Sequence, residues 1–138
     1  MRLVLDTNVL IAAFVADGLC KELLEHCYRR HSVVLSDFII AELREKLANK
    51  FGYSDLSVAA IIEFVSLRSQ FIEPQRLTAA VARDPDDDNI LATAMTGRCE
   101  CVITGDKDLL ELVEFEGARL MSPRQFLEFE DRGTDGVS

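Results

Sequence analysis

Two acidic residues follow closely on short apolar runs that have the character of strands. Asp6 comes directly after residues 2–5, and Asp106 comes after the run 101–104, across Gly105. In a parallel sheet the strand ends meet at one edge, which is where ligands bind in doubly wound folds. Two carboxylates about 4 Å apart repel each other by roughly 4 kcal/mol at an effective dielectric of about 20. Such a pair either takes up a proton or holds a cation.

The densest negative charge in the chain is the run DPDDDN at 84–89. A helix N-terminus is stabilised by one or two acids, each by about 0.3–1 kcal/mol, so four acids exceed that need. An EF-hand calcium loop is excluded, because the Gly and the Glu that it requires are absent from their positions. Asp88 lies three, four and seven residues before Leu91, Ala92 and Met95, which places it on the inward face of a helix. We therefore predict that Asp88 faces the site, with Asp87 as the alternative.

Glu42 is the fourth candidate acid. It lies in the helical pattern FIIAELREK, on a face shared with Phe38 and Ile39. Its alternative role is a surface ion pair with Lys46, one helical turn further on, worth a few tenths of a kcal/mol. Lys46 and Lys50 follow Glu42 at helical spacing, so they could line the mouth of a pocket and meet phosphates. Each of the two lysines also fits a solvated helix face.

Short apolar segments that alternate with longer helical patterns determine the fold class. Apolar strands separated by helices are typical of a parallel sheet that is covered on both faces. The sequence therefore predicts an α/β protein, a Rossmann-like three-layer α/β/α sandwich with a central, mostly parallel five-stranded sheet. Residues 1–130 form a single domain in this interpretation, and the tail 131–138 is expected to be disordered. The expected strands are residues 2–5, 32–35, about 71–72, 101–104 and 118–121, and the expected helices cover about 9–14, 19–30, 37–50, 54–67, 89–96, 106–113 and 122–129.

Composition and charge exclude several classes of protein. The 138 residues include 24 acidic and 15 basic ones, and the net charge of −9 argues against a protein that coats nucleic acid through a basic face. No apolar run approaches the roughly 20 residues that a membrane helix needs, so we expect no membrane association. The cysteines at 20, 27, 99 and 101 have no zinc-site spacing, and we expect reduced thiols in a cytoplasmic protein. His26 and His31 are interpreted as part of a solvated helix face or as contacts with a helix C-terminus.

Taken together, the acidic segments resemble the PIN-domain family of metal-dependent ribonucleases. The resemblance extends from Leu3 to about Leu127 and rests on VLDTNVLIAA, SDFIIAELREKL, DPDDDNILATA and VITGDKDLLEL. These segments follow one another in the family's order and at roughly its spacing. The segments DDDNILATA and VITGDKDLL are most similar to the branch that comprises toxins of bacterial and archaeal toxin–antitoxin pairs.

The resemblance implies an endonuclease that hydrolyses RNA phosphodiester bonds with one or two Mg²⁺ or Mn²⁺ ions. In such a site the ions lower the pKa of a bound water and stabilise the leaving oxygen, which leaves a 5′-phosphate and a 3′-hydroxyl on the products. The implied catalytic acids are Asp6, Glu42, Asp88 and Asp106, of which all but Glu42 contact metal directly or through water. By the same resemblance Asn8 and Thr104 orient the carboxylates, and Asp108 is a further metal or water contact.

The resemblance also implies partners: an RNA substrate, an antitoxin protein and a second copy of the chain in a dimer. The apolar helix pair 38–47 and 56–67 offers a surface for dimerisation or for antitoxin docking, and ordinary core packing is the alternative. Two alternatives remain, a housekeeping RNA-processing nuclease and a non-catalytic PIN-fold module that binds a partner protein. A receiver-like phosphoryl-transfer domain is disfavoured, because Asp6 is followed by Thr7 and Asn8 instead of a second acid.

Overall fold

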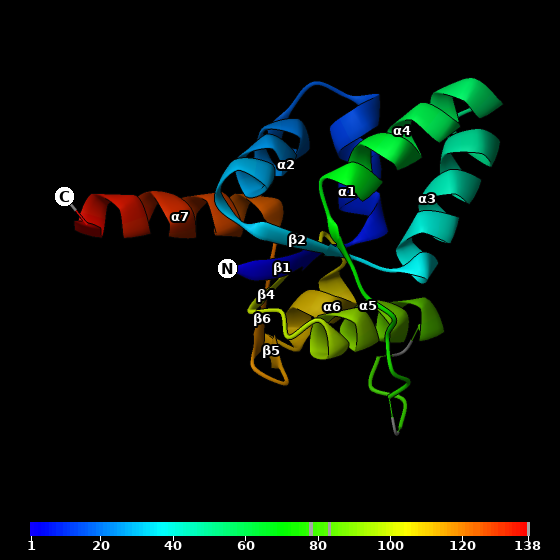
Figure 1. The fold of residues 1–138 in the computed structure, drawn as a ribbon. Coiled ribbons are helices and arrows are strands. Elements are labelled where there is room, and N and C mark those ends of the chain that lie inside the picture. The colour runs from blue at the N-terminus through cyan, green and yellow to red at the C-terminus, as the bar shows by residue number, and fades with distance from the viewer. Residues whose placement is uncertain (78, 83, 138) are drawn as a thin grey trace.

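A mostly parallel sheet with the strand order β3-β2-β1-β4-β6-β5 runs through the middle of the protein (Figure 1). This computed structural model describes residues 1–77, 79–82 and 84–137, of which 133–137 are described by secondary structure alone. Within these ranges neighbouring strands are parallel, except that β5 is antiparallel to β6. The strands are β1 (Arg2–Leu5), β2 (Ser32–Leu35), β3 (Gln70–Phe71), β4 (Cys101–Ile103), β5 (Glu114–Phe115) and β6 (Ala118–Met121).

The predicted α/β class with a mostly parallel sheet is confirmed, and the described residues add one strand to the five expected. The added strand is β5, which has two residues and forms a hairpin with β6. Gly117 in the turn has a φ of 84°, in the left-handed region that glycine adopts without steric cost. A strand of two residues carries no detectable alternation of polar and apolar side chains, so the sequence pattern does not indicate it.

Helices cover both faces of the sheet (Figure 1). In this view α1 and α2 lie above the sheet, and α5 and α6 lie below it. Helix α3 packs on α4 and on α1, while α7 follows β6 and packs on α2. The helices are α1 (Thr7–Val15), α2 (Leu19–Arg30), α3 (Asp37–Asn49), α4 (Asp55–Leu67), α5 (Pro85–Thr96), α6 (Lys107–Glu111) and α7 (Pro123–Val137).

The central strands β1 and β4 are buried on both faces. Leu3, Val4 and Leu5 of β1 are at most 1% exposed, and Val102 and Ile103 of β4 are fully buried. Nearly continuous apolar strands of this kind are what a sheet covered by helices on both faces requires. The ends of β1 and β4 are therefore held side by side, in fixed positions, by the core itself.

Helix α5 begins at Pro85, earlier than the expected start near Asn89. The carboxylate of Asp84 caps it by accepting a hydrogen bond from the backbone N–H of Asp86 at 2.9 Å. Proline suits the first helical position, because its fixed φ is helical and its missing N–H has no helical partner there. The acidic run therefore forms the first turn of α5 and not a loop in front of it.

The C-terminal segment also differs from the expectation. Helix α7 continues to Val137, past the helix end expected near residue 129; Ser138 lies outside the described residues. Neither α7 nor any other helix in the described ranges is long and apolar enough to cross a membrane.

Candidate active site

A small polar pocket of about 80 Å³ lies at the edge of the sheet where β1 and β4 end. Its acids come from separate elements: the residue after β1, a residue of α3, the first turn of α5 and the residue before α6. The lining residues are Asp6, Asn8, Glu42, Lys46, Asp84, Asp86, Asp87, Ile90 and Asp106. The structure thus brings together three of the four predicted catalytic acids, Asp6, Glu42 and Asp106, together with Asn8.

Asp6 is fixed by the end of β1. Its backbone N–H donates to the carbonyl of Ile103 at 2.9 Å, which continues the pairing of β1 with β4 by one residue. The side chain is only 7% exposed, and its Oδ2 accepts a hydrogen bond from the hydroxyl of Thr104 at 2.7 Å. Asp6 is therefore a buried carboxylate with a fixed orientation.

Thr104 connects the two acids at the ends of β1 and β4. Its hydroxyl donates to Asp6 and accepts from the backbone N–H of Asp106 at 3.0 Å. Asp106 in turn caps α6, because its Oδ1 accepts from the N–H groups of Asp108 at 2.8 Å and Leu109 at 3.3 Å. The side chain of Thr104 is fully buried, so no water can replace its hydroxyl without rearrangement.

We expect Thr104→Val to lower the free energy of unfolding by about 2–3 kcal/mol. The variant keeps the shape of the side chain but removes a hydrogen bond to a carboxylate and leaves the N–H of Asp106 without its acceptor. Urea denaturation at neutral pH measures the loss. Thr104→Ser is the matched control, because it keeps the hydroxyl, and it should recover most of the stability. Equal losses in the two variants would show that the methyl group and not the hydroxyl is the important part.

Two acids of α5, Asp86 and Asp87, line the pocket and Asp88 does not, so the geometry favours Asp87, the alternative that the sequence left open, over Asp88. Asp87 is 8% exposed. Asp88 points elsewhere: its Oδ1 accepts hydrogen bonds from the backbone N–H groups of Ala82 at 2.7 Å and Val81 at 3.2 Å. Asp88 therefore holds the segment that precedes α5.

The helical phase of α5 explains why Asp87 and not Asp88 faces the pocket. The buried side of α5 includes Ile90, Leu91 and Ala94, which are at most 2% exposed. These residues follow Asp87 by three, four and seven positions, which is the spacing of one helix face. The prediction of Asp88 relied on Leu91, Ala92 and Met95, of which Met95 is only partly buried. In the sequence, the apolar residues Ile90, Leu91 and Ala94 are the signal that points to Asp87.

Burial and neighbouring negative charges raise the pKa values of two acids in the pocket, Asp6 and Asp87. Burial, then the nearby charges of Asp106 and other acids, raise the pKa of Asp87 to about 6. Burial is also the largest cause that raises the pKa of Asp6; repulsion from Asp106 adds to it, and the Thr104 hydroxyl and Lys46 oppose it. The pocket therefore favours either protons or a bound cation near neutral pH.

Lys46 is the basic residue among those that line the pocket. Its Nζ donates to Oδ1 of Asn8 at 3.1 Å, and its charge lowers the pKa of Asp6. In the part of the chain that the structure describes, Lys46 makes no ion pair with Glu42, so the alternative surface pair is not formed. Asn8 orients this lysine.

Two of the other candidates lie outside the lining of the pocket. Asp108 is exposed, and its backbone N–H donates to Asp106. Lys50 is exposed on the same helical stretch as Lys46, with its Nζ 5.7 Å from the ring centroid of Phe51. In contrast, Asp84 and Asp86 line the pocket, although no sequence pattern distinguishes them from the other acids of the run.

The donor set fits a hard divalent cation. Carboxylate oxygens are the ligands that Mg²⁺ and Mn²⁺ prefer, and the pocket offers no histidine or cysteine that would favour zinc. A divalent ion would also offset the repulsion that raises the pKa values of Asp6 and Asp87. The residues best placed to hold it are Asp6, Asp87 and Asp106.

Comparisons with known proteins identify relatives of the whole fold. A family model described as a PIN domain matches residues 2–108, and no curated protein sequence matches the chain. Among solved structures, VapBC2 from Rickettsia felis bound to a promoter DNA fragment is similar, with 13% sequence identity, a TM-score of 0.63, and coverage of 88% of this chain and 98% of that chain. DNA-bound VapBC from Salmonella typhimurium has 18% identity, a TM-score of 0.60, and coverage of 89% of this chain and 98% of that chain. The PIN domain endonuclease Utp24 has 22% identity, a TM-score of 0.53, and coverage of 88% of this chain and 84% of that chain. At these identities the likeness shows the fold.

Proposed function

The chain belongs to the PIN-domain family, and from this premise we propose that it is a metal-dependent endoribonuclease. The observation that carries the proposal is the meeting of four acids from separate elements in one pocket: Asp6, Glu42, Asp87 and Asp106. The likeness to the PIN domain endonuclease Utp24 supports a nuclease. The pocket, with its raised pKa values and oxygen donors, supports the dependence on Mg²⁺ or Mn²⁺.

The four acids have two kinds of task in the proposed site. Asp6, Asp87 and Asp106 hold one or two divalent ions, and the Thr104 hydroxyl keeps Asp6 in the required orientation. A bound ion of this kind supplies an activated water and neutralises charge on the scissile phosphate. Glu42, which reaches the pocket from α3, orients the attacking water by accepting a hydrogen bond from it.

Lys46 binds the phosphate of the substrate in this proposal. It lies in the pocket among acids, so an incoming phosphate meets one positive side chain there. Its hydrogen bond to Asn8 fixes the direction of its approach. A protein with a net charge of −9 needs such a local cation to bind a polyanion.

We expect Lys46→Ala to raise KM for RNA about 10-fold, because one charge-assisted contact to phosphate is lost. The slope of log affinity against log salt should also fall by roughly 1. Initial rates at several salt concentrations measure both effects. Lys50→Ala is the control, since Lys50 is exposed outside the pocket, and it should leave KM within about 2-fold. Equal effects of the two substitutions would contradict a specific role for Lys46.

We propose the toxin of a toxin–antitoxin pair as the biological role. The supporting observation is the likeness to two VapBC structures, whose matched chains are covered to 98%. The alternative is a housekeeping RNA-processing nuclease. The likeness to the PIN domain endonuclease Utp24, which has the lower TM-score of 0.53, is compatible with a nuclease outside a toxin–antitoxin pair. A non-catalytic module that only binds a partner protein is the remaining alternative, and it predicts no stabilisation by Mn²⁺.

An apolar face around α4 is our candidate surface for an antitoxin or a second copy of the chain. Leu56 and Leu67 on α4 are 85% and 75% exposed. Beside them a groove is lined by residues of α1, α2 and α4 that include Phe14, Tyr28 and Phe64. If the face holds a dimer, Leu67→Glu should shift the protein to monomers in analytical ultracentrifugation. A wild-type monomer would leave the antitoxin as the occupant.

The cysteines support our proposal that the protein works in the cytoplasm. Cys20, Cys27, Cys99 and Cys101 are all free thiols. Burial is the main cause that raises the pKa of Cys27, Cys99 and Cys101 to about 12, so these thiols stay protonated and unreactive. A chain that uses no disulfide suits a reducing compartment.

Cleavage of end-labelled single-stranded RNA tests the proposed function. Wild-type protein and Asp6→Asn are compared with Mn²⁺, with Mg²⁺ and with EDTA, and a single-stranded DNA of the same sequence is run alongside. We expect cleavage of RNA that depends on metal and is lost in Asp6→Asn. Cleavage of DNA alone would contradict the RNA assignment. No cleavage together with no stabilisation by Mn²⁺ would favour the non-catalytic module.

A further inference from the structure

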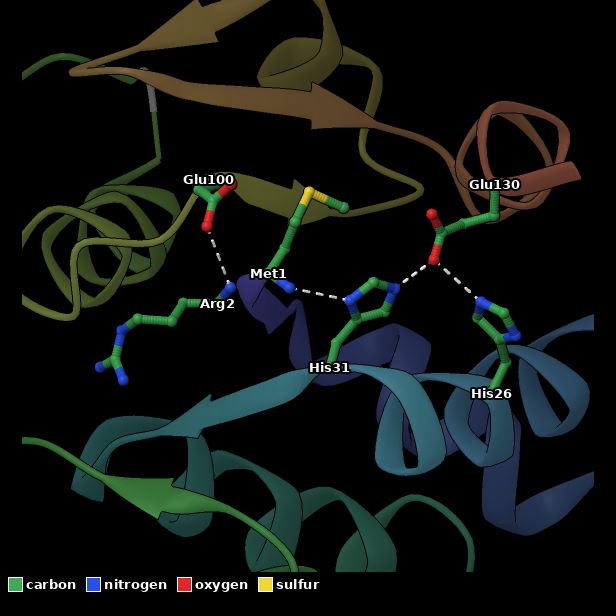
Figure 2. A network of polar contacts seen from close by, with 6 residues as sticks. All are labelled: Met1, Arg2, His26, His31, Glu100 and Glu130. Carbon is green, nitrogen blue, oxygen red and sulfur yellow. Dashed lines mark hydrogen bonds and ion pairs between the residues drawn. The ribbon is translucent and has the colours of Figure 1, made fainter. Parts of the chain in front are cut away.

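A second cluster of metal-ligating side chains lies far from the acidic pocket. It consists of His26 on α2, His31 at the end of α2 and Glu130 on α7 (Figure 2). His31 directly precedes β2, and its Nδ1 lies 3.0 Å from the N-terminal nitrogen of Met1, which precedes β1. The cluster therefore lies at the edge where the parallel strands begin. The acidic pocket lies at the opposite edge, where the strands end. The two sites are therefore separated by the length of the sheet.

The three side chains converge on one point (Figure 2). One oxygen of Glu130 accepts from Nε2 of His26 at 2.9 Å and also contacts Nε2 of His31. One ligating atom from each of the three residues lies within 4.8 Å of the others. A tetrahedral Zn²⁺ with bonds of about 2.0–2.1 Å holds its ligand atoms about 3.3 Å apart, so small side-chain rotations suffice to admit the ion.

The surroundings suit an ion-binding site more than either role that the sequence indicated for the two histidines, a solvated helix face or a contact with a helix C-terminus. The side chains of His26, His31 and Glu130 are 25%, 10% and 19% exposed, so they are partly shielded but still reachable from solvent. The ring of Phe126 packs beside both imidazoles, with centroid distances of 6.4 and 5.8 Å.

We propose that His26, His31 and Glu130 form a binding site for a divalent transition-metal ion of the Zn²⁺ class, which fastens helix α7 to α2. Two imidazole nitrogens and one carboxylate oxygen favour such an ion over Mg²⁺, because nitrogen donors suit zinc and its neighbours. The ligands come from segments about 100 residues apart, since the hydrogen bonds of Glu130 span 104 and 99 positions. The bound ion therefore closes the fold at its C-terminal helix, independently of the proposed nuclease site.

The histidines themselves are the best reporters of this site. The chain has two histidines, and both lie in the cluster, so every histidine signal of the untagged protein comes from it. We titrate Zn²⁺ into ¹⁵N-labelled, tag-free protein and follow the imidazole resonances by long-range ¹H–¹⁵N NMR. We expect both Nε2 resonances to move to metal-bound positions at one equivalent of Zn²⁺. Mg²⁺, which binds oxygen donors, should leave them in place.

Matched variants on α7 identify the third ligand. Glu130→Gln keeps a side chain that can hydrogen-bond to both histidines but removes the charged ligand, and we expect it to weaken Zn²⁺ binding at least about 10-fold. Glu128→Gln, an identical change at an exposed position of the same helix, should bind Zn²⁺ like the wild type. His26→Asn is a second ligand variant, and melting in EDTA confirms that each variant is folded.

Two results would overturn the proposal. The first is a wild-type spectrum in which the imidazole resonances do not respond to Zn²⁺, which would leave the cluster as a hydrogen-bonded contact alone. The second is equal Zn²⁺ affinity of Glu130→Gln and Glu128→Gln. Zinc that binds in the acidic pocket does not confuse the result, because no histidine lies among the residues that line that pocket.

Discussion

Asp87→Asn is expected to reduce RNA cleavage at least about 100-fold, whereas Asp88→Asn should leave the rate within a few-fold of the wild type. Asp87 lines the acidic pocket, so its replacement removes a charged ligand from the proposed metal site. Asp88 lies in the next position of the same helix but binds the backbone of Ala82 and Val81. Cleavage rates of both variants at one fixed Mn²⁺ concentration measure the contrast.

The control for this contrast is stability, because the two substitutions act on different parts of the fold. Asp88→Asn weakens two charge-assisted hydrogen bonds to backbone N–H groups and should cost about 1 kcal/mol of unfolding free energy. Asp87→Asn should cost nothing in metal-free protein, since it removes a repelled charge. An inactive Asp88→Asn beside an active Asp87→Asn would reverse our assignment of the metal-facing residue.

Without metal, the wild-type protein is expected to lose stability relative to Asp87→Asn as the pH rises from about 3.8 to about 6. In the folded protein Asp87 keeps its proton up to a pKa of about 6, whereas in the unfolded chain its pKa is near the ordinary value of 3.8. Between these values the folded state binds more protons than the unfolded state, so stability falls as the pH rises. The two pKa values of Asp87 differ by about two, which corresponds to a change of about 3 kcal/mol in the free energy of unfolding.

Urea denaturation in EDTA at several pH values measures this effect. The difference between wild type and Asp87→Asn cancels the titration of the other acids to a first approximation, so it isolates Asp87. The unfolding free energy of the wild type, relative to that of Asp87→Asn, should be higher below pH 4 than above pH 6, by the contribution of the Asp87 titration. Mn²⁺ at pH 7.5 should restore stability to the wild type and not to Asp87→Asn. If the unfolding free energies of the two proteins have parallel pH profiles, Asp87 does not have a raised pKa in the folded protein.

The strands and the edge of the sheet that holds the site could be predicted from local sequence. The buried runs at residues 2–5 and 101–104 each lead into an acid, and the parallel pairing of β1 with β4 brings Asp6 and Asp106 together. The position of Glu42 rested instead on its helical spacing from Phe38 and Ile39, and its selection as a site residue rested on the family resemblance. These features depend on short-range patterns and on one rule of sheet topology, so the sequence contains them.

The choice between Asp87 and Asp88 could not be made reliably, because it depends on the exact phase of α5. A helix residue turns by about 100° per position, so an error of one residue moves a side chain from the pocket to the outer surface. The apolar residues Ile90, Leu91 and Ala94, which the structure buries deeply, are the stripe that points to Asp87. Ala92 is apolar and buried too, at 5% exposure, so the stripe that points to Asp88 was credible as well.

The histidine cluster was beyond reach of the sequence for a different reason. His26 and His31 lie on a segment of ordinary amphipathic character, and nothing near them in the sequence identifies Glu130 as a partner. The contact forms because α7 follows β6 and packs on α2, with Phe126 buried beneath it. Such a cluster depends on tertiary packing between segments about 100 residues apart.

Binding of Mn²⁺ to the metal-free protein, followed by the EPR signal of the free ion, tests most directly whether the four acids form a divalent-metal site. We predict that the wild type binds one or two Mn²⁺ ions, that Asp87→Asn binds at least about 10-fold more weakly, and that Glu130→Gln binds like the wild type. A wild-type protein that leaves all Mn²⁺ free at millimolar concentration, or equal affinities of wild type and Asp87→Asn, would contradict the account.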